Sequence, residues 1–372
     1  MYFRRNTFTV VHAGGTILMS LPWSVTWRKA LVSVPRLVPD VLLQFTSPEG
    51  PQPLVIKLPS RGKHLIPVYV FIPPSMLPAA DAFVGLPVLI DFHGGGFVLG
   101  SCQEQAPFCA KFCRELRCVA ISVDYRLGPY AQFPSALEDA EDVVNAVIRP
   151  EAPGYAELRQ NINDFLTSKS RSTVQLDSTR VALSGFSSGG NLALNLVLSI
   201  NPPQLSEPWP CPFPLEHSNE IPVLMYYAAI DLRKLPSERE IVAALKDAPK
   251  GFAETLKLES HLVPTYLPRE KSGHLRASPG LAEIKNGGLH TRARCLVILA
   301  EKDNLTPQNE IWVQKAINEG RGNDIRLDKY LGVVHGYTQF PDSWLDEHTL
   351  HAKIETHNKA VDFVRGWWGR VG

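Results

Sequence analysis

The pentapeptide GFSSG at residues 185–189 constrains the fold of this chain more than any other segment. It fits the pattern G-x-S-x-G, in which a serine sits on a sharp turn between a strand and a helix. Residues 180–184 before it predict a short buried strand, and residues 190–198 after it predict a helix. Small neighbours keep the approach to such a serine clear, and the helix N-terminus offers N–H groups to negative charge. The pattern therefore predicts that Ser187 is a nucleophile.

A second motif lies upstream, where an apolar strand at 86–92 runs directly into His-Gly-Gly-Gly at 93–96. Glycines have no Cβ, so their backbone N–H groups can face a ligand at close range. In acyl transfer such groups stabilise the oxyanion. Losing one donor typically raises the activation barrier by about 2.7–4 kcal/mol. The alternatives are a flexible turn or a phosphate-binding loop, but the Gly-Lys-Ser/Thr of a phosphate loop is missing.

These two motifs together resemble those of the hormone-sensitive-lipase-like branch of the α/β-hydrolases. The similarity extends to VDYRLGP and FPSALEDA within 123–140, LVILAEKDNL at 296–305 and GVVHGY at 332–337, and covers about residues 50 to 365. It implies an α/β-hydrolase fold: a mostly parallel central sheet flanked by helices, with a helical cap over the active site.

The resemblance also implies a catalytic triad. Ser187 would be the nucleophile, His335 the general base and Asp303 the carboxylate that orients the histidine. These residues occur in the α/β-hydrolase order Ser, Asp, His. Asp303 and His335 each follow a predicted strand, where loops gather at one edge of a parallel sheet. Asp231, at the end of the preceding predicted core strand, is the alternative acid.

By the same resemblance, the oxyanion hole consists of Gly94, Gly95 and the N–H of Ser188. His93 would then shape the loop and take no part in the chemistry. The chain departs from the family around the nucleophile, because an acidic residue commonly precedes the serine and alanine follows it. Here these positions hold Phe186 and Ser188, which bears on substrate range and rate more than on the type of reaction.

Three aromatic residues near these motifs, Phe97, Tyr125 and Phe186, are predicted to line the substrate pocket. The resemblance assigns the cap to residues 1–45 and to an insertion at about 232–290. The remaining chain, 46–372, is predicted to form the catalytic domain. A chain of 372 residues can bury a large core, and one α/β domain with insertions fits this length.

Strands are predicted where short apolar or β-branched runs are bounded by turn residues. They are 38–45, 54–58, 63–72, 88–92, 119–123, 181–184, 223–228, 295–300 and 325–330, and the first three are expected to open the sheet in antiparallel fashion. The predicted helices are 105–116, 135–148, 189–200, 307–318 and 347–367. This alternation favours a mostly parallel sheet. Residues 150–178 are polar and are interpreted as a surface insertion with loop character, and 239–246 as an amphipathic piece.

Composition excludes several classes of function. The net charge is +1, from 38 basic and 37 acidic side chains, and no basic stripe predicts a nucleic-acid partner. No metal site is expected, because His348 and His351 share a helix face without an apparent third ligand. No cofactor is required, and the expected partner is a small-molecule ester, with a homodimer left open.

Six cysteines without C-x-x-C spacing are interpreted as reduced, buried thiols, which favours a cytoplasmic location. The partly apolar stretch 8–27 is interrupted by histidine, glycine and proline. It is therefore too broken for a signal peptide or a membrane-spanning helix. Membrane association is not expected.

The sequence predicts a serine carboxylic-ester hydrolase that acts on small to medium esters or lactones through an acyl-enzyme on Ser187. A natural-product tailoring enzyme on the same fold, such as a deacetylase, lactonase, acyl-transfer or condensation catalyst, is the alternative. A non-catalytic ligand receptor is a third hypothesis, since the family includes hormone receptors. In these the triad histidine is typically replaced, whereas His335 is present here.

Overall fold

A computed structural model of the chain describes residues 49–74, 85–246 and 261–369. At its centre lies an eight-stranded sheet with the order β1-β2-β4-β3-β5-β6-β7-β8. The strands are β1 (Leu54–Pro59), β2 (Leu65–Phe71), β3 (Leu86–Phe92), β4 (Val119–Val123), β5 (Leu176–Phe186), β6 (Ile221–Tyr226), β7 (Ala293–Lys302) and β8 (Ile325–Val334). β2 pairs in antiparallel fashion with β1 and β4, and every other pair is parallel. The predicted α/β class and the antiparallel opening of the sheet are confirmed.

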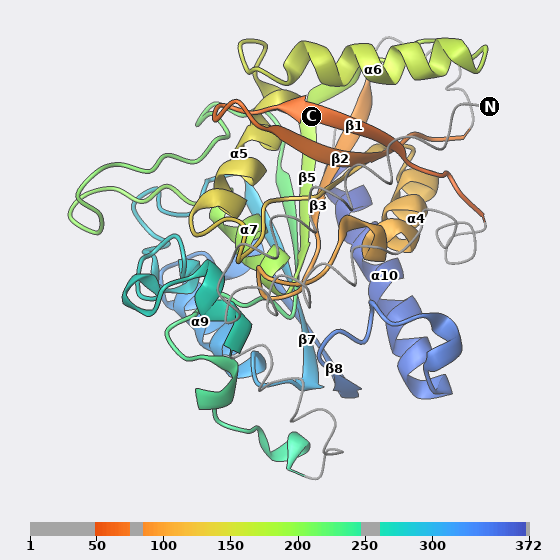
Figure 1. Ribbon diagram of the computed structural model, residues 1–372. Coiled ribbons are helices and arrows are strands. Elements are labelled where there is room, and N and C mark those ends of the chain that lie inside the picture. The colour runs from red at the N-terminus through yellow and green to blue at the C-terminus, as the bar shows by residue number, and fades with distance from the viewer. Residues whose placement is uncertain (1–48, 75–84, 247–260, 370–372) are drawn as a thin grey trace, which may run out of the picture.

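Helices cover both faces of this sheet (Figure 1). They are α4 (Ala106–Leu116), α5 (Ser135–Ile148), α6 (Tyr155–Ser168), α7 (Ser188–Asn195), α9 (Thr306–Asn318) and α10 (Glu347–Trp368). One buried cluster holds the apolar faces of α5, α6, α7 and α9, and a second holds those of α4 and α10. In the central strands, alternate residues belong to the two clusters: Ile90 of β3 lies in the first and Leu89 in the second. Parallel strands sandwiched in this way bring their carboxyl ends to one edge, where the site lies.

The structure differs from the sequence-based expectation in residues 150–178. This stretch was expected to have loop character, but it contains the 14-residue helix α6. Leu158, Ile162 and Leu166 recur every four residues and are its buried positions. Most of the other positions are polar, and Phe165 is partly buried against the same core cluster. These apolar side chains dock the helix against α5 and β1.

Other elements differ only in extent. Helix α7 ends at Asn195, where residues to 200 had been expected to continue it, because Leu198 and Ile200 make isolated bridges to Leu289 and Trp209. In place of the amphipathic piece at 239–246 there is a short 3₁₀ turn, Ala243–Leu245. The predicted strand 38–45 and cap segment 1–45 lie outside the described residues.

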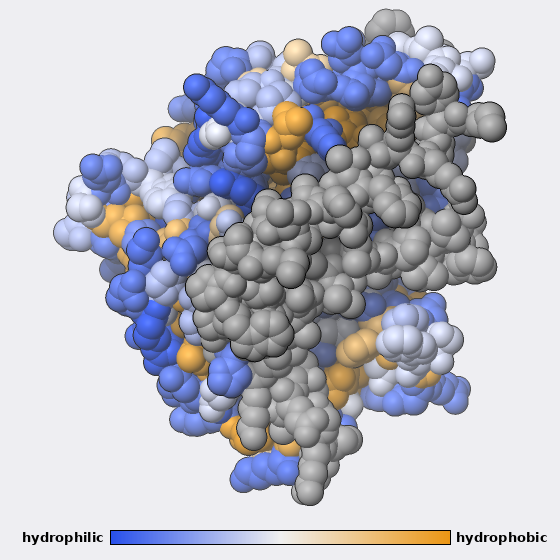
Figure 2. Space-filling model, in the orientation of Figure 1, coloured by the Kyte–Doolittle hydropathy of each residue, from blue (hydrophilic) through white to orange (hydrophobic). Residues whose placement is uncertain are grey.

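The described surface on the face shown in Figure 2 is mostly hydrophilic, with hydrophobic side chains in scattered groups. Within the described ranges, no helix is both long enough and apolar enough to cross a membrane.

Candidate active site

Ser187 sits on the turn between β5 and α7, as the G-x-S-x-G pattern predicts. Its backbone is strained, with φ 53° and ψ −111°, a conformation that non-glycine residues rarely adopt. The two glycines of the pattern are required by close backbone approach. A Cβ on Gly185 would lie 2.0 Å from the carbonyl oxygen of Gly189, and one on Gly189 would lie 2.0 Å from that of Phe92. The first turn of α7 is thus pressed against the end of β3.

The structure brings Ser187, His335 and Asp303 together. Nε2 of His335 lies 3.2 Å from Oγ of Ser187, and Nδ1 of His335 lies 2.7 Å from Oδ2 of Asp303. Asp303 directly follows β7 and His335 directly follows β8, so strand ends supply both. A carboxylate can only accept, which makes Nδ1 the protonated nitrogen and leaves Nε2 free to accept the serine proton. This is the arrangement that activates a serine hydroxyl.

Asp231, the alternative acid, is paired with an arginine and not with His335. Its carboxylate accepts hydrogen bonds from Nε and Nη2 of Arg233, two residues along the chain. The histidine ring is therefore oriented by Asp303.

The glycine loop that follows β3 is held by its own backbone. The carbonyl of Gly95 accepts hydrogen bonds from the N–H groups of Val98 and Leu99. Gly95 has φ +111°, and a Cβ there would lie 2.1 Å from the carbonyl oxygen of Leu99. His93 shapes the loop, since its Nδ1 donates to the carbonyl of Gly94 over 2.6 Å. The close approach and the positive φ mean that only glycine fits at position 95.

This loop and the serine turn are neighbours. A Cβ on Gly94 would lie 3.2 Å from the carbonyl oxygen of Phe186, the residue before Ser187. Ser188 is the first residue of α7, where backbone N–H groups have no partner within the helix. The groups expected to form the oxyanion hole thus lie on two adjacent segments beside Ser187.

The three aromatic residues expected to line the pocket have different surroundings. Phe97 is buried and stacks on Tyr266, with ring centroids 4.7 Å apart. Phe186 lies in the core cluster of α4 and α10, stacked on Tyr226 and meeting Phe108 edge to face, and the structure does not bring its ring to the serine side chain. Tyr125 is buried beneath the glycine loop.

Tyr227 is a site neighbour that the sequence reasoning missed. Its ring meets that of His335 edge to face, with centroids 4.7 Å apart. Its hydroxyl lies 2.6 Å from Oγ1 of Thr338 and donates to Oε1 of Gln339 over 3.3 Å. Tyr227 therefore supports both the histidine and the loop that carries it. Its place immediately after β6, at the same sheet edge as Asp303, is the signal that could have found it.

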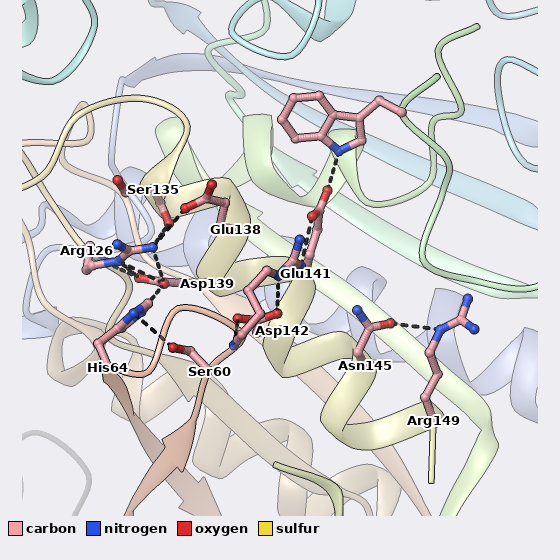
Figure 3. A network of polar contacts seen from close by, with 12 residues as sticks. Ser60, His64, Arg126, Ser135, Glu138, Asp139, Glu141, Asp142, Asn145 and Arg149 are labelled. Atoms are coloured by element: carbon pink, nitrogen blue, oxygen red, sulfur yellow. Dashed lines mark hydrogen bonds and ion pairs between the residues drawn. The ribbon is translucent and has the colours of Figure 1, made fainter. Parts of the chain in front are cut away.

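A polar network along α5 fixes the loop that carries Tyr125 (Figure 3). The carboxylate of Asp139, 1% exposed, accepts from the backbone N–H of Arg126 over 2.8 Å and from its Nε over 3.0 Å. The same carboxylate lies 2.7 Å from Nε2 of His64, in the turn between β1 and β2. Because Arg126 directly follows Tyr125, this network sets the position of the tyrosine backbone.

No group of three or more histidine, cysteine, aspartate or glutamate side chains is placed to hold a metal ion in the part of the chain that the structure describes. The six cysteines are buried free thiols. Burial raises the pKa of Cys118, Cys211 and Cys295 to about 12, so these thiols are poor nucleophiles.

Comparison with known proteins places the chain in a family. A family model described as having the alpha/beta hydrolase fold matches residues 89–339. The chain therefore belongs to the hormone-sensitive-lipase-like carboxylesterase family of α/β-hydrolases.

Among curated relatives, a probable carboxylesterase 6 of Arabidopsis thaliana is 36% identical over 260 residues, which are 68% of this chain and 65% of that protein. A 3-O-acetylpapaveroxine carboxylesterase of Papaver somniferum is 38% identical over 80 residues, which are 21% of this chain and 25% of that protein. The chain spans less than two thirds of the length of each of these relatives.

Solved structures share the fold. An esterase of Pyrobaculum calidifontis superposes with a TM-score of 0.63 at 23% identity, covering 94% of this chain and 96% of that one. Carboxyl esterase 2 of the fungus Tuber melanosporum gives a TM-score of 0.58 at 20% identity, covering 85% and 87%.

Proposed function

We propose that this protein is a serine carboxylic-ester hydrolase that forms an acyl-enzyme on Ser187. The observation that carries the proposal is the hydrogen-bonded series Ser187, His335, Asp303, with contacts of 3.2 Å and 2.7 Å. Membership in the carboxylesterase family and the names of the curated relatives support ester hydrolysis as the reaction. Small to medium esters or lactones are the proposed substrates.

In the proposed reaction, Oγ of Ser187 attacks the ester carbonyl and its proton passes to Nε2 of His335. The oxyanion that forms accepts hydrogen bonds from the N–H groups of Gly94, Gly95 and Ser188. Collapse of this intermediate breaks the bond to the alkoxy oxygen, which takes the proton from His335 and leaves as the alcohol. Water then attacks the acyl-enzyme with His335 again as base, which releases the acid and restores Ser187.

Hydrolysis of p-nitrophenyl acetate, butyrate and octanoate by the wild type and by Ser187→Ala tests the proposal. We expect the wild type to hydrolyse these esters and the variant to be inactive. The dependence of kcat/KM on acyl-chain length then indicates how long an acyl group the pocket accepts. Equal turnover by the two proteins would refute the assignment of the nucleophile.

A tailoring enzyme of natural-product metabolism is the second candidate. The name of the Papaver somniferum relative, which refers to an O-acetylated compound, supports it, as does the departure from the family at Phe186 and Ser188. Product analysis with added acceptor alcohols distinguishes the two, since acyl transfer yields a new ester and hydrolysis yields the acid. A folded wild type that is inactive on all three esters would favour this candidate, or a receptor, over a general esterase.

A further inference from the structure

Two buried hydroxyl groups connect the segments of the proposed oxyanion hole. The hydroxyl of Tyr125 donates to the carbonyl oxygen of His93 over 2.7 Å, and its oxygen lies 3.4 Å from Oγ of Ser188. Tyr125 is 1% exposed and Ser188 is fully buried. Tyr125 thus touches the glycine loop on one side and the residue after the nucleophile on the other.

The direction of the protons follows from the number of donors. A tyrosine hydroxyl carries one proton. Because that proton is donated to His93, Tyr125 can only accept at its contact with Ser188, so Ser188 is the donor there. Within the described residues the Ser188 hydroxyl has no second hydrogen-bond partner. The result is a directed series from Ser188 through Tyr125 to the carbonyl of His93.

This series ends on a peptide group that matters for the reaction. The carbonyl of His93 and the N–H of Gly94 belong to the same amide, and that N–H is one of the proposed oxyanion donors. A hydrogen bond to an amide oxygen draws electron density from the nitrogen and strengthens its N–H as a donor, and bonds in series reinforce one another. The series starts at Ser188, whose own N–H is another proposed donor.

The surrounding contacts keep these groups in place. The imidazole of His93 stacks on the Tyr125 ring, with centroids 4.3 Å apart and an interplanar angle of 11°. A Cβ on Gly189 would lie 2.6 Å from the carbonyl oxygen of His93, so α7 packs directly against the acceptor of the series. Asp139 fixes the backbone on the other side of Tyr125.

We propose that Ser188 and Tyr125 are positioning residues that couple the two sides of the oxyanion hole and strengthen the N–H of Gly94 as a donor in the transition state. This inference rests on the proposed function. It also gives a role to the hydroxyl that this chain carries where its family commonly has alanine.

A double-mutant cycle tests the coupling. We expect Tyr125→Phe to lower kcat for p-nitrophenyl butyrate by about 10- to 100-fold with KM little changed, which is less than the loss of a direct oxyanion donor. Ser188→Ala should lower kcat by about 3- to 10-fold, because 3.4 Å is a long hydrogen bond. The double variant should be no slower than Tyr125→Phe alone, since the series passes through Tyr125. Ser188→Thr, which keeps a hydroxyl, should recover part of the rate.

Tyr226→Phe is the matched control. Tyr226 is as buried as Tyr125, but its hydroxyl has no hydrogen-bond partner within the described ranges. This variant makes the same chemical change at an equally buried position and should keep the wild-type kcat. Thermal unfolding of all variants separates a loss of rate from a loss of fold.

The backbone amide of Gly94 provides a readout that does not depend on activity. In protein labelled with ¹⁵N-glycine, with the Gly94 signal assigned through Gly94→Ala, its proton resonance should move upfield in Tyr125→Phe and Ser188→Ala and stay in place in Tyr226→Phe. Unchanged resonances, additive losses of kcat, or losses seen only in KM would overturn the coupling. A Ser187→Ala enzyme that stays active would overturn the proposed function, whatever the Gly94 signal shows.

Discussion

Oδ2 of Asp303 lies 2.7 Å from Nδ1 of His335, while its Oδ1 accepts the N–H of Leu305 over 2.8 Å. Both carboxylate oxygens are therefore engaged, and the group is only 3% exposed. A carboxylate held in this way keeps the histidine ring in the orientation that turns Nε2 toward Ser187.

Replacing this carboxylate by an amide should disable the site with little effect on its shape. In Asp303→Asn the side chain can present an N–H to Nδ1, which favours the wrong tautomer, and kcat should fall by about 10⁴-fold. Asp231→Asn is the matched control, because Asp231 also follows a core strand and pairs with Arg233 instead of the histidine. Steady-state kinetics on a p-nitrophenyl ester measures both. A larger loss in Asp231→Asn would contradict the assignment of Asp303.

Gly95→Ala should break the glycine loop. A methyl group there would lie 2.1 Å from the carbonyl oxygen of Leu99, and the φ of +111° is strained for any other residue. The loop must move, and the proposed oxyanion donors must move with it. We therefore expect kcat to fall by at least about 10²-fold.

Gly96→Ala is the control for this substitution. Gly96 also has a positive φ, +61°, but the nearest atom to an added Cβ is a methyl carbon of Val263 at 3.5 Å. Gly96→Ala should lower the free energy of unfolding by about 1 kcal/mol and leave kcat within a few-fold of the wild-type value. Similar rates for the two variants would show that the close approach at Gly95 is unimportant.

The position of the candidate site could be predicted because it depends on strand ends. Ser187, Asp303 and His335 each follow a strand that the sequence predicts, and parallel strands bring their ends to one edge. The orientation of Phe186 follows from the alternation of side chains along β5. Ala182 and Phe186, four residues apart, share the face covered by α4 and α10. That alternation is present in the sequence, although Phe186 lies directly before Ser187 along the chain.

Other features depend on tertiary contacts that no local pattern encodes. The hydroxyl of Tyr125 finds the carbonyl of His93, 32 residues earlier, only after β3 and β4 have paired. Tyr227 meets His335 across 108 residues of sequence, and the two are close only because β6 and β8 end at the same edge. Helix α6 was missed because three buried side chains among polar ones give a weak periodic signal.

Asp91 should make stability fall as pH rises. This carboxyl is fully buried between strands and accepts from Oγ of Ser184 over 2.6 Å and Oγ of Ser122 over 3.2 Å. Burial raises its pKa from 3.8 to about 7, although the two hydroxyls lower it in part. Between these values the folded state binds the extra proton, so its stabilising effect is present at low pH and is lost as pH rises through 7.

Asp91→Asn removes this titration and keeps a side chain of the same shape. From pH 5 to pH 8 the wild type should lose about 2–3 kcal/mol of unfolding free energy relative to the variant. Urea unfolding at the two pH values measures the difference. Asp164→Asn, an exposed position in α6, should behave as the wild type does. Parallel pH dependence of the wild type and Asp91→Asn would show that Asp91 does not bind a proton on folding.

His357 should have the opposite effect, with stability falling as pH falls. It lies in α10, and burial lowers its pKa from 6.5 to about 3, with smaller contributions from the charges of Lys353 and Lys111. The unfolded chain therefore takes up a proton below about pH 6.5 that the folded state binds only near pH 3, and stability is lost across that interval.

His357→Phe should relieve this acid sensitivity. Nε2 of His357 has no hydrogen-bond partner within the described part of the chain, and its ring packs against those of Phe108 and Tyr226, so phenylalanine fits the same surroundings. The variant should gain about 2 kcal/mol over the wild type at pH 5 relative to pH 7.5, measured by urea unfolding. His351→Phe, at an exposed position of the same helix, separates this effect from a general one of removing a histidine. An equal gain in both variants would mean that burial of His357 is not its cause.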